Sequence, residues 1–505
     1  MKHSVSGNHL LPSQVKYIAE SAYQIDMDAF LVGGVLRDSI LGTTNPDIDI
    51  TVIGSATDMG KKIAQTMNLR WFPLDTKRDI CRVVSSDSRS KIQIDIASVQ
   101  NGISFDVSKR DFTINTLALN LKTIDFAGEV PQFKLSDVID NHGGVKDLQN
   151  GLLKMTSEKV FSDDPLRILR AARMEAQNNF RMDENTKTQI KKNSVLISEV
   201  SGERIREEFL KLLSMKNTVQ NLKKMDELGI LTNIIPELEP TRKTTQNPNH
   251  HWNVLEHMLQ TAGQVENIVT GKITNMGPFP EFIGKYIPTN AFQKDYLGQN
   301  YSDGCSRLTF LKLSGILHDI GKPITKSVES NGKIRFLNHD KLGGEMAYSI
   351  LKRLKFSNTG IELVRNQIEN HLRPSQISNP GQKPTFKAIR KYYRDTDNAS
   401  IDILYLNMAD YLATKGPNLT RKEWSDHCDI IKIIMDSESS YKKAINQDRL
   451  LSGHDIMVGL RLKPGPLIGT LIKEVEEARL DGVVANKKEA LELIRHRINS
   501  GEYIA

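Results

Sequence analysis

The sequence predicts an α+β chain in which a small mixed-sheet head precedes an all-helical neck, a second helical domain and a helical tail. Short strand-like apolar runs occupy the first part of the chain, and from about residue 157 the pattern becomes helical. The length of 505 residues also exceeds one ordinary hydrophobic core. We expect the head at 1–155, the neck at 156–240, the second domain at 245–415 and the tail at 416–505.

The head is expected to open with a helix over residues 12–28. Val15, Ile18 and Ala22 are spaced there for one apolar helical face. Strands and one helix, Thr57–Met67, should follow. The expected strands are Phe30–Val32, Ile48–Ile53, Cys81–Val84 and Ile92–Ile96.

Helices account for the rest of the chain. The expected neck helices are Asp164–Asn178, Asp183–Asn193 and Glu203–Leu213. A tract rich in Thr, Asn and Pro, Pro240–Asn249, indicates a linker. The second helical domain is interrupted at Gly271–Ser306, where many Gly, Pro, Asn and Tyr residues predict a long surface insertion.

Composition restricts the class of protein. The net charge of +7 and pI of about 9.0 favour a polyanionic partner without requiring one. No apolar run is long enough to cross a membrane, so no membrane partner is expected. Three scattered cysteines, Cys81, Cys305 and Cys428, form neither a disulfide framework nor a CxxC metal motif. These features predict a cytoplasmic protein.

Two glycines are the first candidates for phosphate binding. Gly33 and Gly34 lie in Leu31-Val-Gly-Gly-Val-Leu-Arg-Asp38, between an expected strand and an expected helix. Glycines there let the backbone approach a triphosphate, and the start of the helix offers free N–H groups. Arg37 adds a cation beside them. Taken alone, the segment is equally compatible with an ordinary glycine turn.

Three aspartates favour the catalytic interpretation. Asp47 and Asp49 are two residues apart in an expected strand, so both carboxylates project from one face. Adjacent like charges are costly unless a cation neutralises them, and Mg²⁺ prefers oxygen ligands. Asp95, in a neighbouring strand-like run, should reach the same surface. We expect these three residues to be catalytic, with Asp47 and Asp49 binding Mg²⁺; an acidic exposed strand face is the alternative.

The ordered motifs resemble the nucleotidyltransferase superfamily and, within it, the bacterial tRNA nucleotidyltransferase and poly(A) polymerase family. The first motif is Gly33-Gly34-x-x-Arg37-Asp38, followed by Asp47-x-Asp49. Three further segments follow in the family's order: Lys109-Arg-Asp-Phe-Thr-Ile-Asn115, Phe161-Ser-Asp-Asp-Pro-Leu-Arg-Ile-Leu-Arg170 and Glu203-Arg-Ile-Arg-Glu-Glu208. The resemblance covers about residues 30–240. It departs from the family at Asp163, where the family usually has Glu.

The resemblance implies nucleotide-binding roles for residues of these segments. Arg110 and Asp111 would help to seat the triphosphate and ribose, and Asn115 would face the sugar. The other implied nucleotide contacts are Asp164, Arg167, Arg170 and Arg204.

Asp164 and Arg167 are also the basis of a separate argument about the donor nucleotide. Three residues apart on one helix, they would share a face. A carboxylate accepts from an exocyclic amine, and a guanidinium donates to ring acceptors. Cytosine and adenine carry that amine, whereas uracil and guanine present oxygen. The pair would thus select CTP and ATP without a template; a plain surface ion pair is the alternative.

The second helical domain contains an adjacent His318-Asp319 pair at the end of an apolar helix. Aspartate is rarely buried without a partner, and a metal ion is one such partner. Further candidate ligands follow the order of the HD phosphohydrolase superfamily, which the region resembles: His257, His339, His371 and Asp410.

The HD resemblance implies one or two divalent metal ions, which could be Mn, Ni, Fe or Mg. His257, His318, Asp319 and Asp410 would be direct ligands, and His339 and His371 would complete a second site. It also implies hydrolysis of small phosphates or of RNA 2′,3′-cyclic ends, although a scaffold role stays open. His250 and His251 are expected to be linker residues.

The tail resembles the C-terminal region of HD-containing tRNA nucleotidyltransferases, which implies contact with the tRNA elbow. It contains a second adjacent pair, His454-Asp455, without nearby histidines. We therefore expect Asp455 to be a turn or helix-cap residue, not a metal ligand.

The sequence favours a template-independent enzyme that adds CCA to the 3′ end of tRNA from CTP and ATP. A poly(A) polymerase, or a partial enzyme adding only CC or only A, shares the same motifs. An HD phosphohydrolase with a nucleotide-binding head belongs to another class, and the set of three aspartates argues against it. A structural RNA-binding protein would leave both candidate metal sites unexplained. The oligomeric state does not follow from the sequence.

Overall fold

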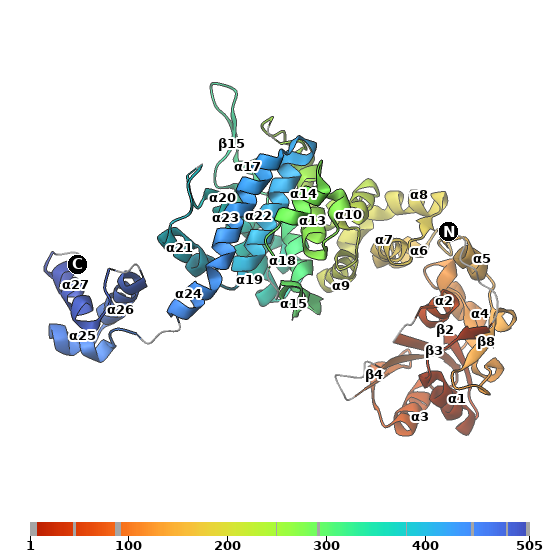
Figure 1. Ribbon diagram of the computed structural model, residues 1–505. Coiled ribbons are helices and arrows are strands. Elements are labelled where there is room, and N and C mark those ends of the chain that lie inside the picture. Colours follow the sequence, from red (N-terminus) through yellow and green to blue (C-terminus); the bar gives the residue numbers. More distant parts are fainter. Residues whose placement is uncertain are drawn as a thin grey trace. The chain divides into compact units, whose positions relative to one another are not determined.

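The protein is described here by a computed structural model. It covers residues 8–43, 47–85, 92–248, 250–289, 293–379, 381–445, 449–480 and 483–500. Two compact units form: Met1–Pro240 with Ile350–Ser357, and Thr241–Ser349 with Asn358–Ala505. A mixed sheet in the N-terminal part and helices thereafter confirm the predicted α+β class (Figure 1). Among the described residues, no helix is long and apolar enough to span a bilayer.

The head contains a sheet of seven strands in the order β4-β5-β6-β3-β2-β7-β9. The strands are β2 (Asp28–Val32), β3 (Asp47–Ile53), β4 (Arg70–Asp75), β5 (Ile80–Val84), β6 (Gln93–Ser98), β7 (Ala118–Asn120) and β9 (Val138–Ile139). Strands β3 and β6 are parallel, whereas the other neighbours are antiparallel. The four expected strands are present, and β4 is an edge strand that the sequence pattern did not indicate.

One face of this sheet is apolar because buried residues alternate with polar ones along the central strands. Ile48, Ile50 and Val52 of β3 are buried. Helices α1 (Gln14–Gln24) and α3 (Ala56–Met67) belong to this core; α3 contacts β3, β5 and β6. The polar residues of β3 therefore project from the other face.

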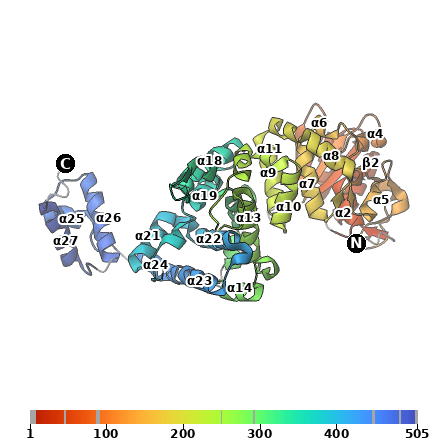
Figure 2. The same cartoon turned by 90° about the horizontal axis from the view of Figure 1, so that it is seen from above.

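The neck is a group of helices that lie together in both views (Figures 1 and 2). Its helices are α6 (Val160–Asp163), α7 (Leu166–Asn178), α8 (Glu184–Asn193), α9 (Gly202–Leu213), α10 (Thr218–Glu227) and α11 (Ile230–Ile234). The expected helix from Asp164 begins two residues later. Asp164 is extended, with φ −149° and ψ 100°, because the following Pro165 disfavours a helical conformation there.

The second unit is built around α13 (Val254–Thr270), which packs against α16 (Arg307–Leu317) and α22 (Ser400–Lys415). Helix α19 (Asn358–Glu369) packs on α16. The expected linker ends at Asn249, which lies outside the described residues.

Most described residues of the segment 271–306, predicted to be a surface insertion, are exposed or partly exposed, but the segment is anchored by buried apolar residues. This segment contains α14 (Pro280–Tyr286) and α15 (Gln293–Gly298), and Ile283 and Leu297 are fully buried. The indole Nε1 of Trp424 donates to the Ile283 carbonyl at 3.1 Å. The high content of Gly, Pro and Asn in this segment therefore did not indicate that Ile283 and Leu297 are buried.

The tail forms a small core of its own from α25 (Gly453–Leu460), α26 (Pro466–Leu480) and α27 (Lys487–Asn499). The predicted cap role of Asp455 is confirmed. Asp455 accepts from the Ser452 N–H at 2.8 Å, and its own N–H donates to Ser452 Oγ at 3.1 Å. Such reciprocal bonding begins a helix and leaves Asp455 unsuited to a metal.

Candidate functional site

Three carboxylates lie on the polar face of the head sheet. Asp47 and Asp49 are on β3, and Asp49 is directly opposite Asp95 of the parallel strand β6. Side chains in register on adjacent strands share a face. The register of β3 and β6 therefore brings the three residues expected to be catalytic onto one surface.

Their electrostatics differ from those of an ordinary acidic surface. Burial raises the pKa of Asp49, and the charges of Asp95 and Asp47 raise it further, although Arg110 acts in the opposite sense. Asp95 accepts two hydrogen bonds from Arg82 of β5, at 2.6 Å and 2.8 Å. Ionised Asp49 is disfavoured beside the carboxylates of Asp47 and Asp95. A bound cation would compensate these negative charges, so the site is suited to one.

Gly33 lies between β2 and α2 (Gly34–Ile40) with φ +71° and ψ −128°. A Cβ atom here would collide with Arg110 Nη1 and lie 3.3 Å from Asp49 Oδ2. The backbone conformation favours glycine, and a Cβ atom would force the Arg110 side chain to move. The turn thus holds the Arg110 guanidinium close to Asp49.

A cavity of about 330 Å³ adjoins Asp49. It is lined by residues of the head and the neck: Gly34, Arg37, Asp49, Arg110, Asp111, Asn115, Asp164, Leu166, Arg167, Arg170 and Arg204. Except for Leu166, these are residues that the sequence assigned to nucleotide binding or catalysis. Five arginines against three aspartates make this lining suited to a polyanion.

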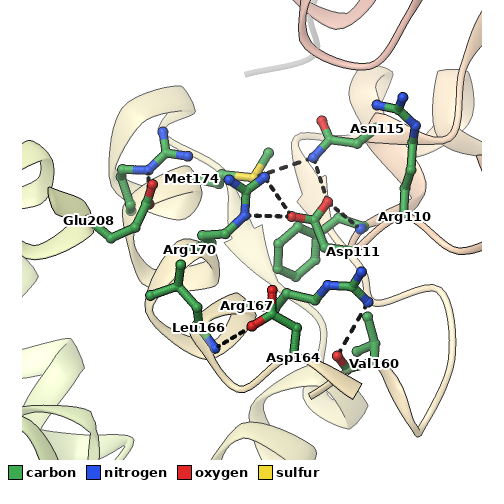
Figure 3. A network of polar contacts seen from close by, with 12 residues as sticks. Arg110, Asp111, Asn115, Val160, Asp164, Leu166, Arg167, Arg170, Met174 and Glu208 are labelled. Atoms are coloured by element: carbon green, nitrogen blue, oxygen red, sulfur yellow. Dashed lines mark hydrogen bonds and ion pairs between the residues drawn. The ribbon is translucent and has the colours of Figure 1, made fainter. Parts of the chain in front are cut away.

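A buried polar network forms one wall of the cavity (Figure 3). Arg170 donates to Asp111 Oδ2 at 2.9 Å, and Asn115 donates to Asp111 Oδ1 at 2.8 Å. Arg37 donates to Asn115 Oδ1 at 2.9 Å. Burial would raise the pKa of Asp111, but Arg170 and Asn115 outweigh it and lower that pKa. Asp111 is therefore ionised and fixes Arg170 and Asn115 in place.

The expected pairing of Asp164 with Arg167 on one helical face was wrong. Asp164 lies before α7 and accepts from Arg204 of α9 at 2.8 Å. Arg167 instead donates to the backbone carbonyl of Lys109 at 3.0 Å. It also donates to the carbonyl of Val160 at 3.4 Å (Figure 3). Pro165 breaks the helix between them, so the two side chains reach the same cavity from different backbone conformations.

Helix α7 is held against α9 by a second, largely buried ion pair. Arg173 Nε lies 2.6 Å from Glu208 Oε2, and the two side chains are 15% and 6% exposed. Because Arg170 is one turn from Arg173 on α7, this pair fixes the helix that lines the cavity. The sequence does not indicate the pairing of Arg173 with Glu208, because the two residues lie on different helices.

The second unit contains a buried cluster of histidine and aspartate. His257 of α13, His318 after α16 and Asp410 of α22 form one group with ligand atoms within 4.8 Å of one another, and His318, Asp319 and His371 form another. Asp319 belongs to both sets of contacts. Its Oδ2 atom lies 3.3 Å from Nε2 of His257 and of His318, and its Oδ1 atom lies 3.3 Å from His339 Nε2.

The histidine rings are oriented by backbone carbonyls. Each of three Nδ1 atoms faces the carbonyl three residues earlier: His318 at 3.0 Å, His339 at 2.6 Å and His371 at 2.7 Å. In a neutral ring, Nδ1–H donation to a carbonyl leaves Nε2 unprotonated and aimed at the cluster, as a metal ligand requires. Burial lowers the pKa of His318, but Asp319 and Asp410 outweigh it and raise that pKa to about 10, so a metal ion would displace a proton from this ring. Burial and the neighbouring His318 lower the pKa of His371 to about 4, so this ring is neutral at pH 7.

Two side chains that the sequence analysis did not place at this cluster also contact it. Lys322 Nζ lies 2.6 Å from Asp319 Oδ2. His250, expected to be a linker residue, has its ring centroid 5.9 Å from that of His257. The position of His250 could not be inferred from the sequence, because it depends on the path of the segment before α13. Lys322 is only three residues from Asp319, so its spacing was a readable signal.

Comparison with known protein families accounts for most of the chain. The "Poly A polymerase head domain" matches residues 29–154, and the "Probable RNA and SrmB- binding site of polymerase A" matches residues 179–241. The "HD domain" matches residues 305–415. The CC-adding tRNA nucleotidyltransferase of Thermus thermophilus is 26% identical over 92% of each chain. The chain belongs to the tRNA nucleotidyltransferase and poly(A) polymerase family.

The protein is accordingly a nucleotidyltransferase. Relatives in this family differ in the nucleotides they add: the Deinococcus radiodurans relative, 26% identical over 92% of this chain and 94% of its own, is an A-adding tRNA nucleotidyltransferase. The fold matches a Thermotoga maritima CCA-adding enzyme solved with tRNA, at a TM-score of 0.55 and 20% identity, covering 96% of this chain and 94% of that one.

Arg82 is the residue of this nucleotidyltransferase head that sequence reasoning missed most clearly. It lies directly opposite Asp95 in the β5–β6 pair. A single arginine in a short strand gives no signal by itself. Only the register of the two strands shows that it contacts a catalytic candidate.

Proposed function

We propose that the protein adds CCA to the 3′ end of tRNA, using CTP and ATP, by in-line attack of the RNA 3′ hydroxyl on the α-phosphate. The bond to the β-phosphate breaks, and pyrophosphate leaves. The observation that carries this proposal is the cavity in which Asp49 of the head and Asp164, Arg167 and Arg204 of the neck meet. Side chains suited to bind phosphates and to contact a base thus line the same cavity as Asp49, the candidate metal ligand. Relatives that add CC or A to tRNA support the same reaction class.

Asp47 and Asp49 would hold Mg²⁺, with Asp95 as the third carboxylate. The raised pKa of Asp49 and the single face shared by the three residues fit a divalent cation. When bound, such ions lower the pKa of the attacking hydroxyl and neutralise charge on the leaving oxygens.

The chain's own residues would orient the donor nucleotide. Arg37 and Arg110 would bind the triphosphate, and Asn115, held by Asp111, would position the ribose. Asp164 and Arg167 would contact the base edge, where the carboxylate accepts from the exocyclic amine of cytosine or adenine. Because Arg204 already occupies one oxygen of Asp164, the base would either share that carboxylate or displace Arg204.

Loss of the metal-binding carboxylates tests this assignment. The double substitution Asp47→Ala, Asp49→Ala should abolish incorporation of labelled CMP and AMP into tRNA. The thermal unfolding temperature should remain close to that of the wild type, because removing clustered like charges does not destabilise a fold. Retained incorporation by the double variant would contradict the proposal.

We also propose phosphoester hydrolysis at the cluster in the second unit. The observation that favours it is Asp319, whose two oxygens face different histidines. His257, His318 and Asp410 would hold one divalent ion, Mn, Ni, Fe or Mg, and His339 and His371 a second, with Asp319 between them. Metal ions in such sites activate water. RNA 2′,3′-cyclic ends and small phosphates are the substrate class.

We place the enzyme in the cytoplasm. Its three cysteines, Cys81, Cys305 and Cys428, are free thiols. Unpaired cysteines are typical of proteins in a reducing compartment.

A further inference from the structure

The face of the head sheet that carries the three aspartates continues to the edge of the sheet. Asp49 is opposite Asp95, Asp95 is opposite Arg82 of β5, and Arg82 is opposite Phe72 of β4. Residues in register share a face, so these four side chains form one row across four strands.

Phe72 is an unusual member of this row. It is 41% exposed, although phenylalanine is one of the residue types most often buried in proteins. Its neighbour Trp71 projects from the other face, where Lys61 of α3 lies 5.4 Å from its ring. The sheet therefore covers one aromatic ring of β4 with a helix and leaves the other accessible on the catalytic face.

Three arginines lie on the same β4–β5 hairpin as this aromatic ring. Arg82 lies beside it in the row, and its side chain is 31% exposed while it bonds Asp95. Arg70 of β4 is exposed and lies on the same face, opposite Val84. Arg78, in the turn between β4 and β5, has an 80% exposed side chain. Aromatic rings with interleaved cations on an open sheet are typical of surfaces that bind single-stranded nucleic acid.

We propose that Phe72 and Arg82 form the binding track for the 3′-terminal nucleotides of the acceptor RNA, with a base stacked on Phe72. The inference rests on the proposed function, because it takes the RNA 3′ hydroxyl to react at Asp49 and Asp95. Adjacent strands are about 4.8 Å apart, so Phe72 lies about 10 Å from Asp95 across the sheet. Stacked nucleotides rise by about 3.4 Å each. Phe72 thus lies about three stacked nucleotides upstream of the reacting end.

Binding of matched RNAs to the full-length protein tests the track. One fluorescent RNA minihelix ends in a single-stranded A-C-C overhang, and the other is blunt. Without nucleotides, Phe72→Ala should weaken binding of the overhang RNA about tenfold, equivalent to about 1.4 kcal/mol, and leave the blunt RNA unchanged. Phe72→Trp should restore the affinity because it retains a stacking surface. Tyr23→Ala, which removes an 87% exposed aromatic ring elsewhere in the head, should change neither affinity.

The proposal is overturned if Phe72→Ala leaves the overhang affinity unchanged, or if it weakens both RNAs equally. The latter result would indicate a general effect on the head or a protein-binding role for the ring. Addition of labelled AMP by the wild type is measured on the same overhang RNA, which already ends in CC. No addition, together with the expected Phe72 effect, would contradict the proposed function and leave the RNA track supported.

Discussion

At the scale of single residues, Gly33 connects the backbone to the chemistry of the head. Two features favour glycine at this position: the backbone φ is positive, and Arg110 lies where a Cβ atom would be. Gly42, at the end of the same helix, also has a positive φ of 72°, but no heavy atom lies within 4 Å of the position of its Cβ. Alanine at Gly42 would therefore cause backbone strain alone, whereas alanine at Gly33 would cause backbone strain and also displace Arg110.

Gly33→Ala should weaken binding of ATP about tenfold, because the added methyl group would displace Arg110 from the cavity that we propose binds the triphosphate. Both Gly33→Ala and Gly42→Ala should lose stability by about 1–3 kcal/mol from backbone strain. Calorimetric titration with ATP, combined with urea unfolding, distinguishes the two effects. Equal ATP affinities for the two variants would contradict the role given to Gly33.

At the scale of elements, the sequence predicted the central strands because their apolar residues alternate, and it predicted that Asp47 and Asp49 share a face. It did not reveal β4, whose Arg70, Pro73 and Asp75 interrupt the pattern. The pairing of Arg82 with Asp95 needs the strand register, which a single sequence does not contain. Pro165 was a readable signal, and its effect on the residue before it would have placed Asp164 outside α7.

The tail helix α25 offers a pH-dependent test at this scale. Hydrogen bonds from Ser452 and then the Lys487 cation lower the pKa of Asp455 to about 2. Because the folded pKa is depressed, the stabilisation is complete above the ordinary value of 3.8 and is lost as the pH falls through about 2. Asp455→Ala should therefore accelerate amide exchange in α25 at pH 7.

The difference in exchange between the wild type and Asp455→Ala should narrow as the pH is lowered from about 4 toward 2. Hydrogen exchange measured by mass spectrometry across this range tests the expectation, with correction for intrinsic exchange rates. Lys442→Ala, which removes an exposed ion pair outside α25, is the control. A difference that persists undiminished at the lowest pH would show that Asp455 does not act through its charge.

At the scale of the whole molecule, the two candidate centres belong to different compact units and share no residue. The head and neck residues that line the nucleotide cavity all precede residue 241, and the histidine cluster lies after it. Because the two centres share no residue, we expect that a substitution in one centre abolishes its activity and leaves the activity of the other intact.

His318→Ala should abolish hydrolysis of 2′,3′-cyclic AMP and leave CMP and AMP addition to tRNA within about twofold of the wild type. The reason is that His318 Nε2 is in contact with both Asp319 and Asp410, whereas no ligand of the head is changed. Removal of divalent ions by a chelator should stop both activities, and their return should restore both. Loss of nucleotide addition in His318→Ala would contradict the independence of the two centres.

The proposed CCA addition is tested most directly by the products formed on defined tRNA ends. Transcripts that end at the discriminator base, at C or at CC are incubated with CTP, ATP or both, and the products are resolved at single-nucleotide resolution. The account predicts two C additions followed by one A and then termination, with A added only to the CC end when ATP is the sole nucleotide. Long A tails, or addition restricted to C or to A on every end, would contradict it.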